Sequence, residues 1–201
     1  MDKKEISQVL QEIATLLELK GDNPFKIRAF SNASRIVETL TADLEKLISE
    51  NKLISIKGIG AHLAQTISEL VKTGMCQEHQ SLKKSVPEGL FELLKLPGLG
   101  PKKVKALYEN LKIKSLKELE RACNENRLLK LSGFGEKTQN KIKESIKNFM
   151  SYQGQHLYPR GEYEALKVLG ELKENKNVER IEIAGSLRRR KEVVKDIDIV
   201  V

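Results

Sequence analysis

Leu96-Pro97-Gly98-Leu99-Gly100 is the stretch that decides the fold, because the same design occurs three times in this sequence. The other two copies are Ile56-Lys57-Gly58-Ile59-Gly60 and Leu131-Ser132-Gly133-Phe134-Gly135. In each copy an apolar residue stands two positions before the first glycine, another lies between the glycines, and a helical pattern follows. The first glycines are 40 and then 35 residues apart. This spacing predicts three hairpins between short helices, numbered here first, second and third in chain order.

A hairpin of this kind offers an anion-binding site. Glycine adopts backbone angles that a Cβ atom forbids, and it lets a bulky phosphate approach the main chain. The amides of the following helical turn are unpaired, and the helix dipole adds to their attraction for an anion. Such a site contacts phosphate and no base edge, so we expect DNA binding without strong sequence preference. The predicted DNA-contacting residues are Gly58, Gly60, Gly98, Gly100, Gly133, Gly135, Lys102, Lys103 and Lys137.

A single Gly-x-Gly also has a purely structural explanation, because helix ends and tight turns use the same residues. Three copies with lysines after the second and third favour DNA binding, most clearly for the first two hairpins. For the third hairpin the alternative is a simple joint between two packed helices.

The residues around the hairpins predict more helices. Apolar residues recur at three- and four-residue steps from Ile6 to Leu17 and from Phe30 to Leu40, and shorter runs follow. Helices are expected to end at Gly21 and at Gly74. Asp22 or Asn23 is expected to cap the helix that starts at Pro24, and Ser115 and Glu118 have the spacing of a capping box.

The pattern changes after Tyr152-Gln153-Gly154, which we interpret as a joint. A helix is expected over residues 159–175 and strands over 178–184 and 196–201. The expected domains are residues 1–85, 86–153 and 154–201, the last of them incomplete.

The composition favours a polyanionic partner. The 201 residues carry a formal net charge of +8, and the sequence has a pI near 9.3. Cys76 and Cys123 are far apart and the three histidines are scattered, so a zinc site is not expected. No apolar run is long enough to span a membrane, and we expect no membrane partner and an intracellular, reducing compartment.

The carboxyl-terminal segment combines Gly185-Ser186, a basic loop and Asp196-Ile197-Asp198. In a strand Asp196 and Asp198 would project from one face, where two carboxylates suit a pair of divalent metal ions. A Gly-Ser turn with Arg189 nearby suits a triphosphate. An edge strand made soluble by acidic residues is the alternative.

The hairpins resemble the helix-hairpin-helix motif. This resemblance implies a potassium or sodium ion held by hairpin carbonyls, which helps to bind a DNA phosphate. The carbonyls would be those near Ile54, Ile56 and Ile59 in the first hairpin and near Leu94, Leu96 and Leu99 in the second.

Together with the Gly185-to-Asp198 segment, the hairpins make the chain similar over nearly its full length to family X DNA polymerases, the bacterial branch above all. Asn23-Pro24-Phe25-Lys26-Ile27-Arg28-Ala29-Phe30 also matches their amino-terminal domain. The implied fold is mainly α, with helix-hairpin-helix domains followed by the start of an α/β nucleotidyltransferase palm.

The resemblance also implies a function, which is gap filling by a DNA-directed DNA polymerase of base-excision or end-joining repair. Gly185, Ser186 and Arg189 would contact the phosphates of a deoxynucleoside triphosphate, and Asp196 and Asp198 would be catalytic and bind Mg²⁺ or Mn²⁺. The implied partner is gapped or primer–template DNA, and the implied location is the bacterial cytoplasm at the nucleoid.

The sequence departs from the family in two respects. The third catalytic carboxylate lies on a later strand, beyond Val201, so we expect a partial chain that binds DNA and does not extend a primer. Thr66 stands where some members have a Schiff-base lysine, and His62 and Gly21 stand where phosphate-binding lysines are usual. Because Thr66 cannot form an imine, and nothing assigns the role to Lys72, we expect no lyase activity and a weaker 5′-phosphate pocket.

Two functions remain open at the level of sequence. One is the amino-terminal part of a repair polymerase, and the other is a non-catalytic helix-hairpin-helix module that binds DNA. A ribosomal or nuclease-type helix-hairpin-helix protein fits less well, because it leaves the Gly185-to-Asp198 segment unexplained.

Overall fold

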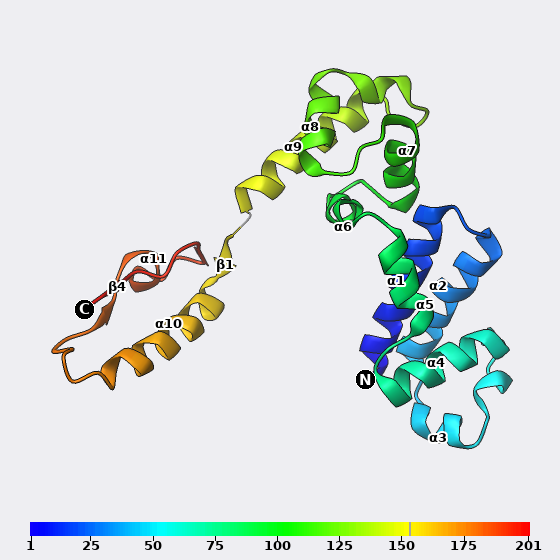
Figure 1. Ribbon diagram of the computed structural model, residues 1–201, viewed down its shortest axis with the longest axis horizontal. Helices are drawn as coiled ribbons and strands as arrows, with labels where there is room; N and C mark the ends of the chain where they lie inside the picture. The colour runs from blue at the N-terminus through cyan, green and yellow to red at the C-terminus, as the bar shows by residue number, and fades with distance from the viewer. Residues whose placement is uncertain (153) are drawn as a thin grey trace. The chain divides into compact units, whose positions relative to one another are not determined.

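The computed structural model describes residues 1–152 and 154–201. They form two compact units, residues 1–146 and residues 147–201 (Figure 1). The first unit is helical, and the second combines a long helix with short strands. Gln153, in the predicted joint and at the predicted end of the second domain, lies outside the described residues, and the predicted boundary near residue 86 stays a prediction.

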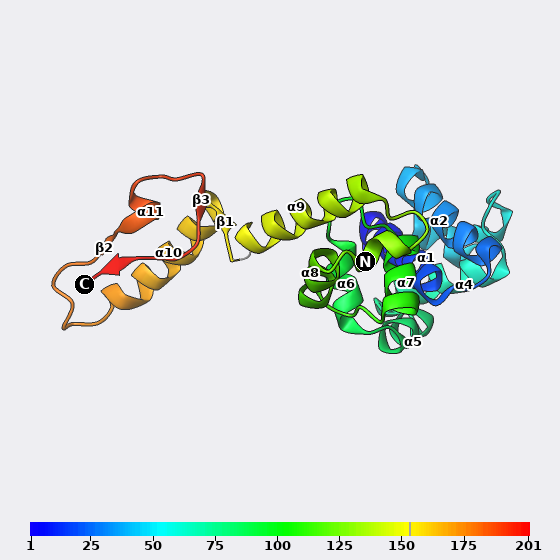
Figure 2. The same ribbon diagram turned by 90° about the horizontal axis from the view of Figure 1, so that it is seen from above.

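The first unit is built around two helices, α1 (Lys3–Lys20) and α2 (Pro24–Thr39), which pack side by side (Figures 1 and 2). A capping box of Asp2 and Glu5 begins α1, and Gly21, with φ 74°, ends it. Asn23 caps α2 as predicted, because its side chain accepts a hydrogen bond from the Phe25 amide at 2.9 Å. Helix α1 contacts α2, α5 and α7. Its fully buried side chains, at 0% exposure, are Ile6, Leu10, Ile13 and Leu17.

Nine further helices follow along the described chain of this unit. They are α3 (Leu44–Ser49), the 3₁₀ helix η1 (Leu53–Ser55), α4 (Ala61–Thr73), α5 (Gln77–Ser85), α6 (Glu88–Leu94), α7 (Pro101–Leu111), α8 (Leu116–Asn124), η2 (Arg127–Lys130) and α9 (Glu136–Tyr152). Of these, α4, α5 and α7 contact α1. Gly74 ends α4 with φ 70°, as predicted. The predicted capping box at the start of α8 forms only in part: the Ser115 hydroxyl accepts from the Glu118 amide, but the Glu118 carboxylate accepts from the Lys114 amide. Helix α9 crosses the division between the two units.

The second unit contains α10 (Tyr158–Lys173), the short helix α11 (Gly185–Arg188) and four two-residue strands. Strand β1 (His156–Leu157) pairs antiparallel with β3 (Val193–Val194), and β2 (Glu182–Ile183) pairs with β4 (Ile199–Val200). Helix α10 packs against β1, β3 and α11 (Figure 2). The small core consists of Ala165, Leu187 and Val194, flanked by Tyr158 and Ile183.

The strands predicted over 178–184 and 196–201 are both too long. Glu182 pairs with Val200 and Ile183 with Ile199, so in this register residues 178–180 would pair beyond Val201. Asp196 would face Ser186, but the chain turns into α11 at Gly185 and leaves that position without a partner strand. Asp196 therefore lies in a bend and Asp198 directly before β4.

Candidate nucleic-acid interface

The three hairpins share one backbone turn. The amide of the middle apolar residue donates to the apolar residue three positions earlier: Ile59 to Ile56 at 3.0 Å, and Leu99 to Leu96 and Phe134 to Leu131 at 3.1 Å. The first glycine is left-handed in each, with φ 98° at Gly58, 85° at Gly98 and 83° at Gly133. A left-handed third residue closed by this hydrogen bond defines a type II turn, which requires glycine there and accepts proline before it, as at Pro97.

Each turn directs its apolar residue inward and its glycines outward. Ile59, Leu99 and Phe134 are 2%, 3% and 2% exposed, whereas all six glycines are exposed. A buried leucine lies five residues before each first glycine, at Leu53, Leu93 and Leu128. The sequence analysis did not identify this repeated leucine, although its constant distance from the first glycine is visible in the sequence.

The second glycine leaves the next helix open to an anion. Gly60 and Gly100 are the N-cap residues of α4 and α7, and no side chain caps either helix. No heavy atom lies within 4 Å of the place where a Cβ would stand at Gly60, Gly98, Gly100, Gly133 or Gly135. The open space and uncapped amides that a phosphate requires are thus present at these positions.

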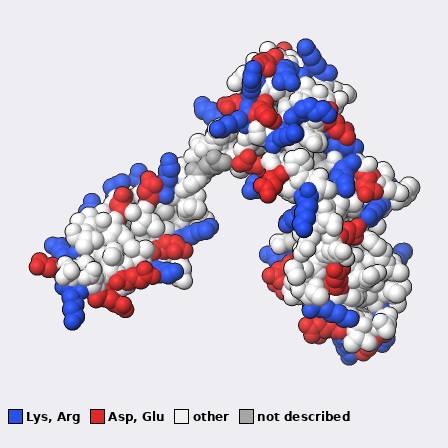
Figure 3. Space-filling model, in the orientation of Figure 1, with Lys and Arg blue, Asp and Glu red and all other residues white. Residues whose placement is uncertain are grey.

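Lysines line a cavity between the second hairpin and α9. The cavity measures about 520 Å³, and its lysines are Lys103, Lys137 and Lys141. Lys103 Nζ donates to the Gly98 carbonyl at 3.1 Å and lies 6.0 Å from the centre of the Phe134 ring, so it links the second and third hairpins. Lys102 is exposed on the first turn of α7. On the face in Figure 3, basic and acidic residues are interspersed, so local clusters decide where an anion binds.

The first hairpin has a different set of charges. Its cavity, of about 590 Å³, is lined by Lys26 and His62 as well as by the turn itself. Both side chains face one carboxylate, because Glu78 Oε1 lies 2.8 Å from Lys26 Nζ and Glu78 Oε2 lies 3.4 Å from His62 Nε2. Glu78 Oε2 is buried and has no hydrogen-bond partner among the described residues. The His62 ring also packs edge-on against Phe30, with the ring centres 5.8 Å apart.

Two positions that depart from the family are explained by their surroundings. Thr66 is buried, and its hydroxyl donates to the His62 carbonyl at 3.1 Å within α4. At Gly21 a side chain would collide with the Lys105 ammonium group, which occupies that space from α7. Lys105 therefore supplies a cation close to Gly21, the position where a phosphate-binding lysine is usual. This contact depends on the tertiary fold and cannot be inferred from the sequence.

The predicted nucleotide-binding residues come together in part. Gly185, with φ 56°, begins α11, and the Asp198 carboxylate packs where its Cβ would stand. The Ala184 amide donates to the Asp198 carbonyl at 2.8 Å, which fixes this arrangement. Ser186 is half-buried in α11, while Arg189 and Asp196 are exposed. Arg188, which the sequence did not single out, lines a cavity of about 520 Å³ together with Gly185.

Across residues 1–152 and 154–201, no three His, Cys, Asp or Glu side chains gather as a metal site would require. Cys76 and Cys123 are free and buried, and burial raises the pKa of the Cys123 thiol to about 11. Within the same residues, no helix has the length and apolar character needed to cross a membrane.

Comparison with known proteins agrees with this geometry. Residues 1–76 match a helix-hairpin-helix domain, and residues 90–148 match a SAM-like helix-hairpin-helix tandem. The chain is 38% identical over its whole length to the DNA polymerase/3′-5′ exonuclease PolX of Bacillus subtilis (strain 168). The chain is thus similar to part of a DNA polymerase of family X, and it spans 35% of the length of that relative.

The two matched models confirm the predicted helix-hairpin-helix fold of the hairpin region. The second model spans both the second and the third hairpin as a tandem. The start of a palm over residues 154–201 stays a prediction, as do the roles of Asp196, Asp198, Gly185, Ser186 and Arg189.

Proposed function

We propose that this chain is the DNA-binding portion and part of the active site of a repair-type, DNA-directed DNA polymerase that fills gaps. The observation that carries the proposal is the threefold repetition of an exposed type II turn, which in the first two copies precedes a helix without a side-chain cap. These turns would hold phosphates of gapped or primer–template duplex DNA. In a bacterial cell such a protein would act at the nucleoid, in the cytoplasm.

A monovalent cation would assist the first two hairpins. Among the described residues, no backbone hydrogen bond ends on the carbonyls of Ile54 and Ile59, and the same holds for Leu94 and Leu99. Carbonyl oxygens suit K⁺ or Na⁺, because they replace the hydration shell of the ion. A bound cation would add positive charge at the phosphate, beside the helical amides.

In the palm, Asp196 and Asp198 would hold Mg²⁺ or Mn²⁺, since carboxylate oxygens suit hard cations. Such an ion would neutralise charge on the transferred phosphoryl group. Gly185, Ser186 and Arg189 would orient the phosphates of the deoxynucleoside triphosphate, and Arg188 is a further candidate. We do not expect the 201-residue chain to extend a primer, and the burial of Thr66 argues against a lyase.

Fluorescence anisotropy with gapped duplexes of unrelated sequence tests the DNA-binding proposal. Affinities should agree among sequences, and log affinity should fall with log salt at a slope of about −3.6 if roughly four phosphates are neutralised. A strong dependence on sequence would contradict binding through the backbone. Exchange of K⁺ for tetramethylammonium should weaken binding if hairpin cations contribute.

A non-catalytic DNA-binding module is the second candidate, favoured by the absence of a three-ligand metal cluster among the described residues. The two functions are distinguished in a chain that extends into the remaining palm. There Asp198→Ala should abolish Mn²⁺ binding, measured by calorimetry, if the palm is catalytic. Unchanged Mn²⁺ binding would favour the module.

A further inference from the structure

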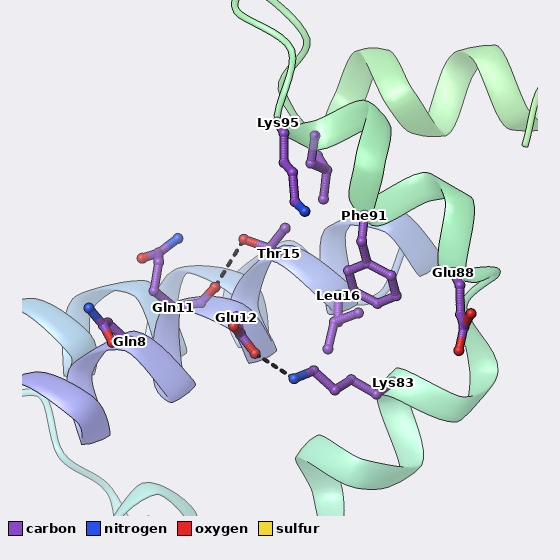
Figure 4. A pocket seen from close by; sticks show the side chains of 10 residues that line it. Gln8, Gln11, Glu12, Thr15, Leu16, Lys83, Glu88, Phe91 and Lys95 are labelled. Atoms are coloured by element: carbon purple, nitrogen blue, oxygen red, sulfur yellow. Dashed lines mark hydrogen bonds and ion pairs between the residues drawn. The ribbon is translucent and has the colours of Figure 1, made fainter. Parts of the chain in front are cut away.

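One cavity of the first unit belongs to none of the three hairpins. It measures about 680 Å³ and lies between α1 and α6, with the end of α5 at its edge (Figure 4). Leu16, Phe91 and Leu94 form its apolar wall. Gln11 and Thr15 line it from the neighbouring turns of α1. A volume of this order is typical of small-molecule and cofactor sites.

Phe91 gives this cavity an aromatic wall in a chain that has few aromatic residues. Phe30 and Phe134 are 1% and 2% exposed and serve the core, whereas Phe91 is only half-buried. Figure 4 shows its ring beside Leu16, on the α1 side of the cavity. A half-buried ring in an apolar cavity is the arrangement on which a flat aromatic group stacks.

The charges at the cavity favour an anionic ligand on one side. Glu12 is neutralised, because its carboxylate lies 2.8 Å from His79 Nε2 and 3.1 Å from Lys83 Nζ. Burial would raise the pKa of Glu12, but hydrogen bonds from Lys83 and His79 outweigh burial and lower it. Lys95 has no carboxylate partner among the described residues, and Figure 4 shows it extending toward Thr15, while Glu88 points away from Phe91.

The cavity adjoins the second hairpin along the chain. Lys95 directly follows α6, and the turn Leu96-Pro97-Gly98-Leu99 begins at the next residue. A DNA strand held at the second hairpin would therefore have Lys95 close by, with Phe91 about one helical turn before it. Aromatic stacking beside a basic group is how proteins bind single-stranded DNA without sequence preference.

We propose that this cavity accepts an unpaired nucleobase of single-stranded DNA, stacked on Phe91, with an adjoining phosphate at Lys95. The proposal rests on DNA binding by the second hairpin and adds a ligand class to it. A base inside a duplex is stacked and paired, so this site would respond only to the unpaired stretch of a gap. Gln11 and Thr15 offer side-chain groups to the base edge.

The test uses 2-aminopurine placed in the unpaired stretch of a gapped duplex, because stacking changes its fluorescence. The full chain should alter that fluorescence, and Phe91→Leu should abolish the change and weaken binding to gapped DNA at least about fivefold. Phe91→Tyr keeps the ring and should behave like the parent chain. Lys95→Ala, which leaves the cavity wall intact, should also weaken binding to gapped DNA.

A blunt duplex of the same length separates the possible failures. If the parent chain does not bind that duplex, the proposed DNA binding fails. All variants should bind the blunt duplex equally. If Phe91→Leu then also keeps the 2-aminopurine fluorescence change and the parent's affinity for gapped DNA, the nucleobase site is refuted. Circular dichroism would show whether Phe91→Leu is folded. If a folded Lys95→Ala variant binds gapped DNA as tightly as the parent chain, the phosphate contact is removed from the proposal.

Discussion

The two glycines of each hairpin serve different physical purposes. Gly98 is needed for its left-handed backbone, with φ 85°, whereas Gly100 has an ordinary φ of −82° and is needed for the open space above the α7 amides. Backbone strain and anion binding can therefore be separated by substitution at these two positions.

Gly98→Ala should destabilise the chain by about 1 kcal/mol, because alanine is strained in the left-handed region. Gly100→Ser should leave stability unchanged or raise it by a few tenths of a kcal/mol, since serine is a favoured N-cap. Its hydroxyl would accept from the amides that a phosphate needs, so DNA affinity should fall about tenfold. Urea unfolding and anisotropy measure the two effects, and tight DNA binding by Gly100→Ser would exclude those amides as the phosphate site.

Glu78 reduces the positive charge at the first hairpin, because it pairs with Lys26 and lies close to His62. Glu78→Gln should therefore tighten binding to gapped DNA about fivefold at low salt, since a unit charge near a surface phosphate is worth on the order of 1 kcal/mol. Glu38→Gln makes the same charge change at an exposed position of α2 and is the control. Weaker binding by Glu78→Gln would instead mean that Glu78 positions the Lys26 and His62 side chains.

Gln139 is a polar residue in a repeated apolar position. It is 3% exposed and stands four residues after Gly135, where the other copies have Ala64 and Val104. Its Nε2 donates to Asn126 Oδ1 at 2.8 Å, but its Oε1 is buried without a partner. Gln139→Met should stabilise the chain by about 0.5–1 kcal/mol, seen as a higher urea midpoint with an unchanged m value. A loss of stability would indicate that ordered water satisfies Oε1.

At the scale of the element, α7 carries the greatest concentration of predicted phosphate contacts. Its start is uncapped, Lys102 and Lys103 lie in its first turn, and Lys105 reaches Gly21. Lysines at a helix start oppose the helix dipole, so they are better explained by an external anion than by helix stability.

Replacing Lys102 and Lys103 by alanine should make the salt slope of DNA binding shallower by about 1.8, since each lost phosphate contact removes about 0.9. The loss of affinity should be equal for all sequences. Lys114→Ala with Lys117→Ala removes the same charge from exposed positions before and in α8 and should change the slope much less. Equal changes in both double variants would mean that only the net charge matters.

The sequence predicts elements well where local chemistry determines them. The caps Asn23 and Ser115, the ends Gly21 and Gly74, and the three turns depend on residues close together in the chain. Helix α5 was not predicted, because Gln77–Ser85 buries a single apolar residue, Leu82. The strand lengths were wrong because strand pairing depends on a register that no single segment contains.

The candidate site shows the same limit. The glycines of the hairpins could be found from their spacing, whereas the contacts of Lys105 with Gly21 and of Glu78 with Lys26 join distant segments. Arg188, rather than Arg189, lines the cavity at Gly185, because α11 sets the direction of these side chains.

At the scale of the whole molecule, the two units differ in the size of their cores. Among the described residues, the core cluster of the second unit has three buried members, and its strands have two residues each. On α10 the large side chains of Tyr163 and Leu166 are 69% and 57% exposed. Isolated strand pairs of this size have little stability of their own.

Hydrogen exchange should therefore show faster amide exchange in α10 than in α1, because local opening follows the apolar area that each element buries. Binding of gapped DNA should slow exchange at the hairpins more than in α10. Equal protection of α1 and α10 without DNA would contradict independent stability of the two units.

The contact between Gly185 and Asp198 has a consequence for any evolutionary or engineered change in the palm. The Asp198 carboxylate occupies the space that a side chain at Gly185 would need, so even Gly185→Ala would displace Asp198. Residues proposed to contact different ligands, the triphosphate and the divalent ion, are thus sterically linked. Under that proposal, a substitution at Gly185 that alters nucleotide selection would change metal affinity as well, and the two properties could not be tuned independently at this position.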